Sequence, residues 1–312
     1  MTNRRALVTG GAGFIGSHLV DALIRDGDEV VAIDNLETGH RDNVNPAARL
    51  VVCDVADPDA VGDAMQGVEV VYHLAAARAV LRSVDFPRES DRANTGGTLN
   101  ILECARQAGA RRVVSTSSSS VYGGAAVTPT PETAPLIPRS PYAVSKMAGE
   151  NYARVYWELH RLETVSLRLF NVYGPRQRPE SAYAAVIPLF VDALRAGRPP
   201  EVHGDGTQSR DFTFIDDTVA AFLAAGSAPA ERCAGKVYNI AGGSDHSLLE
   251  LLEHLKRLLN VDIAPTHTAR RAGDVDRSRA DASAAQRDLG WSATTPFDKG
   301  LAETVAWFTR RG

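Results

Sequence analysis

The sequence predicts an α/β fold built on a doubly wound, mainly parallel β-sheet. Short apolar runs alternate with amphipathic stretches through the first half of the chain, which is the pattern of successive βα units. A glycine-rich turn joins the first apolar run to the first amphipathic stretch. The length of 312 residues is ample for a large core and suits about two domains or one large α/β unit.

The first βα unit carries a dinucleotide-binding pattern. An apolar strand at 5–9 leads into Gly-Gly-Ala-Gly-Phe-Ile-Gly at 10–16, a helix at 17–25 and a strand at 29–33 that ends at Asp34. Glycines let the backbone turn tightly and approach a pyrophosphate at the helix N-terminus, and the acid is placed to hold the adenosine ribose hydroxyls. This order of elements predicts a Rossmann-like cofactor domain.

Asp34 also bears on which dinucleotide binds. A carboxylate at this position repels a 2′-phosphate, so NAD is favoured over NADP. Arg41 is open to two interpretations, a phosphate clamp or a residue of a solvated loop.

More βα units follow along the chain. We expect strands at 50–53, 68–73 and 112–115, and helices at 57–65 and 89–108. Asp54 ends one strand, and the small residues after the next strand leave room for a cofactor to pass closely. Ligands of such a sheet bind beyond the C-terminal ends of its strands.

The run from Pro141 to Tyr152 predicts a helix with Ser140 as its N-cap. Tyr142 and Lys146 then lie one above the other, since they are four residues apart. Lowering a tyrosine pKa from about 10 to 7 takes about 4 kcal/mol, which one cation about 4 Å away supplies at an effective dielectric constant near 20. We therefore expect Lys146 to lower the pKa of Tyr142 and make it a base; the alternative is a surface helix on which the two residues coincide.

Composition excludes several classes of function. Hydrophobic residues make up 44% and charged residues 23%, and 34 basic against 38 acidic side chains give a net charge of −4, with no sign of a nucleic-acid partner. No apolar run suits a membrane span, and the N-terminus lacks a signal-peptide pattern. Three scattered cysteines and eight histidines without a paired motif indicate no metal site. We expect a reduced, cytoplasmic enzyme without a membrane partner.

Together these motifs resemble the extended short-chain dehydrogenases/reductases of the nucleotide-sugar epimerase/dehydratase family. The matching elements cover nearly the whole chain: the glycine turn at 10–16, Asp34, Asp54, His-Leu-Ala-Ala at 73–76, Ser-Ser-Ser-Val-Tyr-Gly at 118–123, Tyr142-x-x-x-Lys146, Arg-Leu-Phe-Asn-Val-Tyr-Gly-Pro-Arg at 168–176, Gly-Asp-Gly-Thr-Gln-Ser-Arg-Asp at 204–211, Arg-Ala-Gly-Asp at 271–274 and Leu-Gly-Trp at 289–291.

The resemblance implies two interleaved domains. Residues 1–170 form the NAD-binding Rossmann-like domain, to which about 212–240 return, and 171–312 form a smaller nucleotide-sugar-binding domain. The helices at 89–108 and 142–160 commonly form a dimer bundle in this family, so we expect a homodimer, although their apolar faces also suit the core of a monomer.

The resemblance further implies a cofactor site and a catalytic trio. The trio is Ser118, Tyr142 and Lys146, which remove a proton from a sugar hydroxyl while hydride passes from the sugar C4 to NAD. The expected cofactor contacts are Gly10, Gly13, Phe14, Ile15, Gly16, Asp34, Asn35, Asp54, Val55, Leu74, Ala75, Ala76, Tyr142 and Lys146.

Two serines separate the branches of this family. The 4,6-dehydratases usually have an Asp-Glu pair at the positions of Ser119 and Ser120, and the decarboxylases usually have Glu at the latter position. This chain has neither acid, so the resemblance favours 4-epimerisation of a UDP-hexose through a transient 4-keto intermediate. A dehydratase, decarboxylase or reductase acting on a nucleotide sugar is the alternative enzyme. A cofactor-binding regulator or structural protein on the same fold is the alternative of another class.

The substrate side is assigned by the same resemblance. Guanidinium groups suit a diphosphate, and Arg178 lies in a Gly-Pro-Arg-Gln-Arg-Pro run that uronate 4-epimerases often carry, although they tend to have Thr in place of Asn171. UDP-glucose and UDP-galactose come first, with UDP-N-acetylhexosamine and UDP-glucuronate as alternatives. The expected substrate contacts are Ser118, Ser119, Ser120, Tyr142, Asn171, Arg178, Arg210, Arg271 and Asp274.

Overall fold

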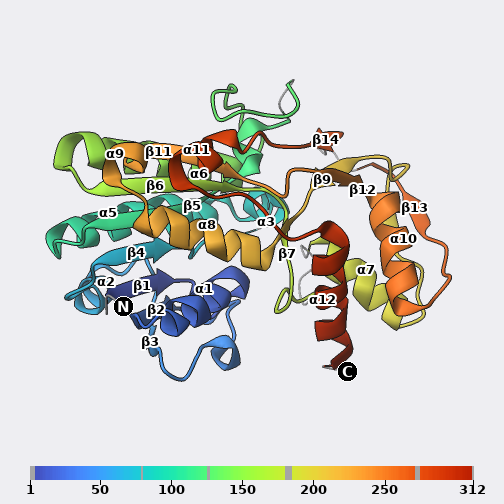
Figure 1. Cartoon of the computed structure of the whole chain (residues 1–312), viewed down its shortest axis with the longest axis horizontal. Helices are drawn as coiled ribbons and strands as arrows, with labels where there is room; N and C mark the ends of the chain where they lie inside the picture. Colours follow the sequence, from blue (N-terminus) through green and yellow to red (C-terminus); the bar gives the residue numbers. More distant parts are fainter. Residues whose placement is uncertain (1–3, 79, 125–126, 180–184, 271–274, 311–312) are drawn as a thin grey trace.

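The computed structural model describes residues 4–78, 80–124, 127–179, 185–270 and 275–310. Its main feature is one seven-stranded sheet with helices on both faces, beside a smaller part that contains the C-terminal helix (Figure 1). The strands of the sheet are β1 (Arg5–Thr9), β2 (Glu29–Asp34), β3 (Arg49–Val52), β4 (Val70–His73), β5 (Arg112–Ser118), β6 (Glu163–Leu169) and β11 (Lys236–Ile240).

All neighbouring strands of this sheet are parallel, and their order is β11-β6-β5-β4-β1-β2-β3. The order reverses between β1 and β4, because the chain first builds outward from β1 to β3 and then returns to the other side. In a doubly wound sheet this reversal opens a crevice beyond the C-terminal ends of the two strands, where ligands bind. The predicted fold class is confirmed.

Two hydrophobic layers cover the sheet. Leu7 and Val71 face one layer, which contains α2, α5 and α6, while Val8 and Tyr72 face the other, which contains α1 and α8. The helices of the larger part are α1 (Phe14–Arg25), η1 (Arg41–Asn43), α2 (Pro58–Ala64), α3 (Val80–Asp85), α4 (Pro87–Asp91), η2 (Arg92–Gly96), α5 (Gly97–Gln107), η3 (Ser119–Tyr122), α6 (Pro141–His160), α8 (Ile215–Ser227), α9 (Ala230–Cys233) and α11 (Ser283–Leu289).

Among the described residues, the smaller part contains three short sheets, β10-β7, β12-β9-β14 and β13-β8, and three longer helices. Its elements are β7 (Val172–Tyr173), α7 (Val186–Arg195), β8 (Glu201–His203), β9 (Ser209–Asp211), β10 (Thr213–Phe214), β12 (Asp245–Ser247), α10 (Leu248–Leu259), β13 (Thr266–Thr268), β14 (Arg277–Ser278) and α12 (Phe297–Arg310). The chain crosses between the two parts more than once, since α8 packs on α1 and β11 pairs with β6 at the sheet edge.

Most predicted elements are present within a residue or two, but the single helix expected at 89–108 is wrong in detail. The structure divides it into α4, the π-helical turn η2 and α5, and α3 precedes it. Within η2, the Asn94 side chain bonds the backbone of Ala77 and the hydroxyl of Ser145. The π turn thus contains a residue whose side chain bonds two other segments, and π turns are frequently found at functional sites.

Among the described residues, no helix is both long and apolar enough to cross a membrane. The same residues contain no cluster of three or more His, Cys, Asp and Glu side chains suited to a metal ion.

Candidate active site

The glycine turn closes the crevice between β1 and β4. Gly10 adopts a left-handed φ of +69°, and a Cβ atom there would lie 2.9 Å from the amide nitrogen of Ala75. A Cβ atom on Gly16 would lie 2.1 Å from the carbonyl oxygen of Gly10, so the close contact between turn and helix requires glycine. Gly13 is the N-cap of α1 and has no side chain to cap Phe14 and the rest of the first turn, which suits a pyrophosphate at the helix N-terminus.

Asp34 lies buried at the end of β2, where the backbone fixes its carboxylate. One oxygen accepts a hydrogen bond from the amide of Ala12 (3.0 Å) and the other from the amide of Leu36 (2.8 Å). A carboxylate oxygen has a second lone pair for a ribose hydroxyl. The turn and this acid therefore fit NAD, the dinucleotide expected from the sequence.

Most of the other expected cofactor residues follow the C-terminal ends of β2, β3 and β4. The amides of Leu74 and Ala75 donate to the hydroxyl of Thr9 (3.1 and 3.0 Å), which holds the 74–76 segment beside the glycine turn. Asp54 is ion-paired with Arg92. The remaining expected residues differ in exposure: Val55 is buried, Ile15 and Ala76 are half-buried and Asn35 is exposed.

Ser118, Tyr142 and Lys146 come together from β5 and α6. Ser140 caps α6, since its hydroxyl accepts a hydrogen bond from the amide of Ala143 (3.1 Å), and this cap sets where the helix begins. Ser118 lies close enough to Tyr142 for its hydroxyl to lower the pKa of the phenol. The ammonium of Lys146 lies 5.9 Å from the ring centroid of Tyr142 and donates to the carbonyl of Thr116 (2.9 Å).

The electrostatics of the pair differ from the expectation that Lys146 lowers the pKa of Tyr142. Burial raises the pKa of Tyr142, and it is the hydroxyl of Ser118 and the charge of Arg78 that lower it in part. Burial also lowers the pKa of Lys146 to about 8, against the charge of Glu150, which raises it. The expectation was wrong in this respect because it counted the attraction of two side chains and left out the cost of removing both from water.

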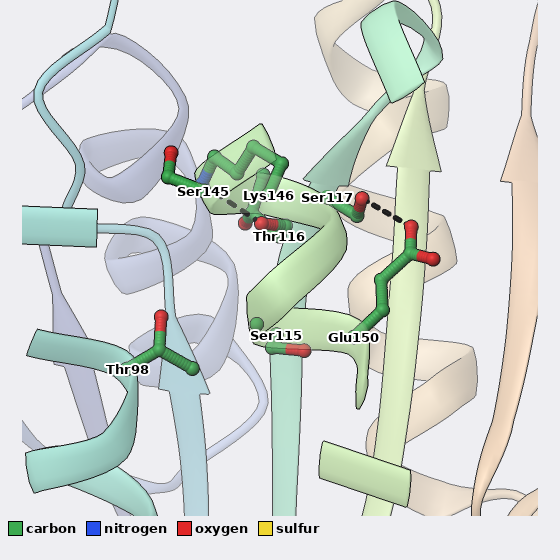
Figure 2. A pocket seen from close by; sticks show the side chains of 8 residues that line it. Thr98, Ser115, Thr116, Ser117, Ser145, Lys146 and Glu150 are labelled. Atoms are coloured by element: carbon green, nitrogen blue, oxygen red, sulfur yellow. Dashed lines mark hydrogen bonds between the residues drawn. The ribbon is translucent and has the colours of Figure 1, made fainter. Parts of the chain in front are cut away.

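Polar side chains of α5, β5 and α6 surround a small pocket that Lys146 and Glu150 line (Figure 2). His73, at the end of β4, bonds the hydroxyl of Thr9 through Nδ1 (2.8 Å) and that of Thr98 through Nε2 (3.0 Å). Further along α6, the carboxylate of Glu150 accepts a hydrogen bond from the hydroxyl of Ser117.

Ser119 and Ser120 lie in η3, directly after Ser118. The amide and the hydroxyl of Ser120 both donate to the hydroxyl of Ser118, at 3.2 and 2.9 Å. The end of β5 therefore presents hydroxyl groups beside Tyr142, and no carboxylate is found at these two positions.

The expected substrate residues come from several segments. Asn171, with a φ of +32°, donates to the carbonyl of Asp211 (3.0 Å). Arg210 in β9 donates to the carbonyl of Val275 (2.7 Å), and Arg178 contacts Nδ1 of His40 (3.3 Å) in the loop that follows Asp34.

Two further expected substrate residues, Arg271 and Asp274, lie outside the described residues.

Sequence reasoning missed two groups at the site. Arg78 follows β4 in the chain, and its charge acts on Tyr142. Its position just beyond the C-terminal end of a central strand, where ligands of such a sheet bind, could have identified it from the sequence. Glu150 was signalled by its spacing of eight residues from Tyr142, which places the two on one face of a helix.

The sequence matches the NAD dependent epimerase/dehydratase family over residues 6–241. A UDP-glucose 4-epimerase of Mycolicibacterium smegmatis is 41% identical over 314 residues, which cover 98% of this chain and 99% of that protein.

Two solved structures are similar along nearly the whole chain. The UDP-glucose 4-epimerase of Thermotoga maritima with UDP-glucose has a TM-score of 0.94 at 34% identity, covering 98% of this chain and 99% of that one. The UDP-N-acetylglucosamine 4-epimerase of Methanobrevibacter ruminantium also has a TM-score of 0.94, at 36% identity, and covers 100% of both chains. On the extent of these matches, the chain belongs to the NAD-dependent epimerase/dehydratase family.

Proposed function

We propose that this protein is a 4-epimerase of a UDP-hexose, with UDP-glucose and UDP-galactose as its substrate pair. The observation that carries the proposal is the pair Ser119 and Ser120 at the end of β5, beside an intact Ser118, Tyr142 and Lys146 set. The similarity to UDP-glucose 4-epimerases along almost the full length supports the same reaction.

Each member of the set has a task at the sugar C4. Tyr142 exchanges a proton with the C4 hydroxyl, and Ser118, which lies beside Tyr142, donates a hydrogen bond to the same sugar oxygen. Lys146 supplies an ammonium group beside Tyr142, held in place by its hydrogen bond to the Thr116 carbonyl. When bound along the glycine turn and Asp34, NAD supplies the acceptor and donor of the C4 hydride together with a positive charge at the nicotinamide.

Dehydration needs more than this set provides. One group must take the C5 proton and another must protonate the departing C6 hydroxyl. Serine hydroxyls at 119 and 120 do neither readily near neutral pH. Return of hydride to the other face of C4 is then the simplest second step, and it consumes no cofactor.

Inversion also requires the sugar to turn over within the site while the nucleotide stays fixed. We assign the diphosphate to Arg210 and Arg271 and the nucleotide ribose to Asp274, which places the fixed end of the substrate in the smaller domain, residues 171–312. Arg210 is a rigid anchor, because two backbone carbonyls accept hydrogen bonds from its guanidinium at 2.7 and 2.8 Å. The hexose is held loosely by comparison, so that both faces of C4 reach the nicotinamide.

A related substrate is the second candidate. The N-acetylated hexose is favoured by similarity to the UDP-N-acetylglucosamine 4-epimerase of M. ruminantium. The uronate is favoured by Arg178 in the Gly-Pro-Arg-Gln-Arg-Pro run, although its guanidinium contacts His40 in this structure.

We also propose that the protein is a homodimer. The outer surfaces of α5 and α6 carry exposed apolar side chains, namely Leu99, Val144 and Leu159. A second copy of the chain packing on these helices would bury them.

Incubation of the purified protein with a panel of UDP-sugars, followed by NMR of the products, tests the proposal. We expect UDP-glucose and UDP-galactose to interconvert without added reductant. A product that lacks the C6 hydroxyl or has lost a carboxylate would overturn the epimerase assignment. Conversion of only the N-acetylated or uronate sugars would move the assignment to the second candidate.

A further inference from the structure

Glu150 lies on the face of α6 that carries Tyr142 and Lys146. Steps of four residues place the three side chains in one column, with neighbouring Cβ atoms about 5–6 Å apart. The column faces β5. Lys146 donates to the Thr116 carbonyl and Glu150 accepts from the Ser117 hydroxyl (Figure 2). Ser118, one residue further along β5, acts on Tyr142. Glu150 is buried, with 6% of its surface exposed.

Two strands hold the carboxylate of Glu150. One oxygen accepts hydrogen bonds from the Ser117 hydroxyl and from Nε of Arg168 (2.8 Å), and the other accepts from Nη2 of Arg168 (2.7 Å). Ser117 and Arg168 are direct register partners on β5 and β6. Because both carboxylate oxygens are bonded to one buried guanidinium, the carboxylate cannot rotate freely. Its negative charge is therefore held at a fixed position beside Lys146.

The other groups around Lys146 do not supply that charge. His73 on β4 is buried and faces the ammonium, and burial together with the Lys146 charge lowers the pKa of His73 to about 3, so it is neutral. Tyr142, on α6 itself, is a phenol whose pKa is raised by burial. β5 contributes the uncharged Thr116 and Ser117, and Arg168 on β6 is a cation. Within the described residues, Glu150 is the group whose charge favours the ammonium form.

We propose that Glu150 is a positioning residue that keeps Lys146 an ammonium, with Arg168 and Ser117 holding its carboxylate in place. The value of a charged Lys146 rests on the proposed 4-epimerase function, in which it serves the Tyr142 proton transfer. Arg168 has a second task, since it also donates to the Tyr122 hydroxyl (2.8 Å) and so ties this column to the segment after β5.

The composition of the chain allows a direct test. The sequence contains four lysines, Lys146, Lys236, Lys256 and Lys299. Protein labelled with ¹³C at the lysine Cε position therefore gives few NMR signals, and the signal lost in Lys146→Arg is that of Lys146. Its chemical shift followed against pH gives the titration midpoint of Lys146 without any turnover.

We expect the Lys146 midpoint of the unsubstituted protein near 8 and that of Glu150→Gln lower by about one pH unit, because an opposite charge at this separation is lost. The matched control is Glu163→Gln. Glu163 also pairs with a buried β5 arginine, Arg112, but at the opposite end of β5 and β6. This variant should lose comparable stability and leave the Lys146 midpoint in place.

Glu150→Gln leaves the buried Arg168 without a charged partner, so this variant risks poor folding. The double variant Glu150→Gln/Arg168→Gln removes both charges and should still lower the midpoint, because Glu150 is the member of the pair whose charge acts on Lys146. An unmoved midpoint in the folded variants, or an equal shift in Glu163→Gln, would overturn the role of Glu150. In assays, the alkaline limb of kcat should move with the midpoint while KM changes little. Absence of UDP-sugar turnover in the unsubstituted protein would overturn the proposed function and leave the NMR result standing.

Discussion

We expect His73 to make the free energy of unfolding fall at acid pH, because its hydrogen bonds in the folded protein fit only the neutral imidazole. The Thr9 hydroxyl accepts hydrogen bonds from the amides of Leu74 and Ala75, so its own proton points to Nδ1 of His73. Nδ1 is then an acceptor, and Nε2–H donates to Thr98. A second proton on the ring would meet the proton of Thr9 inside the core.

The magnitude follows from the pKa of His73. Burial, and to a lesser degree the charge of Lys146, lower this pKa from 6.5 to about 3. Between pH 6.5 and about pH 3, His73 is protonated in the unfolded chain but neutral in the folded protein. The free energy of unfolding therefore falls as the pH falls through this range. The linkage relation gives a loss of about 2 kcal/mol in the free energy of unfolding between pH 7.5 and pH 5.

Urea unfolding curves at a series of pH values measure this loss. His73→Gln removes the titrating group, so its free energy of unfolding should fall by about 2 kcal/mol less than that of the unsubstituted protein over the same pH range. All other titrating groups contribute equally to both proteins and cancel. His267→Gln, at an exposed histidine, is the control for loss of a histidine elsewhere: an effect as large as that of His73→Gln would show that the loss is not specific to His73. Parallel curves for His73→Gln would refute the reasoning.

Three further predictions concern the cofactor and the chemistry. Tyr142→Phe should retain the fold and NAD binding but lose nearly all turnover, and substantial residual activity would mean that another group moves the C4 proton. Calorimetry should find NAD bound more tightly than NADP, because Asp34 repels a 2′-phosphate; the opposite order would contradict the role of Asp34. Gly16→Ala should destabilise the protein by about 1–3 kcal/mol or more, since its Cβ atom would lie 2.1 Å from the Gly10 carbonyl, whereas Gly62→Ala in α2, with open space around it, should stabilise it by about 0.5–1 kcal/mol. Thermal unfolding of the two alanine variants decides between these signs.

Local patterns were enough to predict the parallel sheet, the glycine turn and the helix that begins at Ser140, because each depends on residues close together in the chain. The helix bears this out, since the predicted N-cap bonds the amide three residues later. The family and its cofactor NAD are likewise confirmed. The division into two domains and the roles of the site residues stay predictions.

Features that depend on tertiary contacts were beyond the sequence. The pKa of Tyr142 is set first by burial, which no spacing of Tyr and Lys reveals. Arg78 follows β4 in the chain, and its effect on Tyr142 in α6 depends on how the fold brings the two together. The π turn at 92–96 contains Asn94, whose hydrogen-bond partners lie 17 and 51 residues away in the chain.

The fate of hydrogen at the sugar C4 tests the central claim most directly. UDP-glucose carrying deuterium at C4 is incubated with the protein, and the product is read by NMR and mass spectrometry. Inversion through one site, with the nucleotide held throughout, predicts UDP-galactose that retains the deuterium at C4, without net accumulation of NADH. A product lacking the C6 hydroxyl, or loss of the label with stoichiometric NADH, would contradict the epimerase assignment.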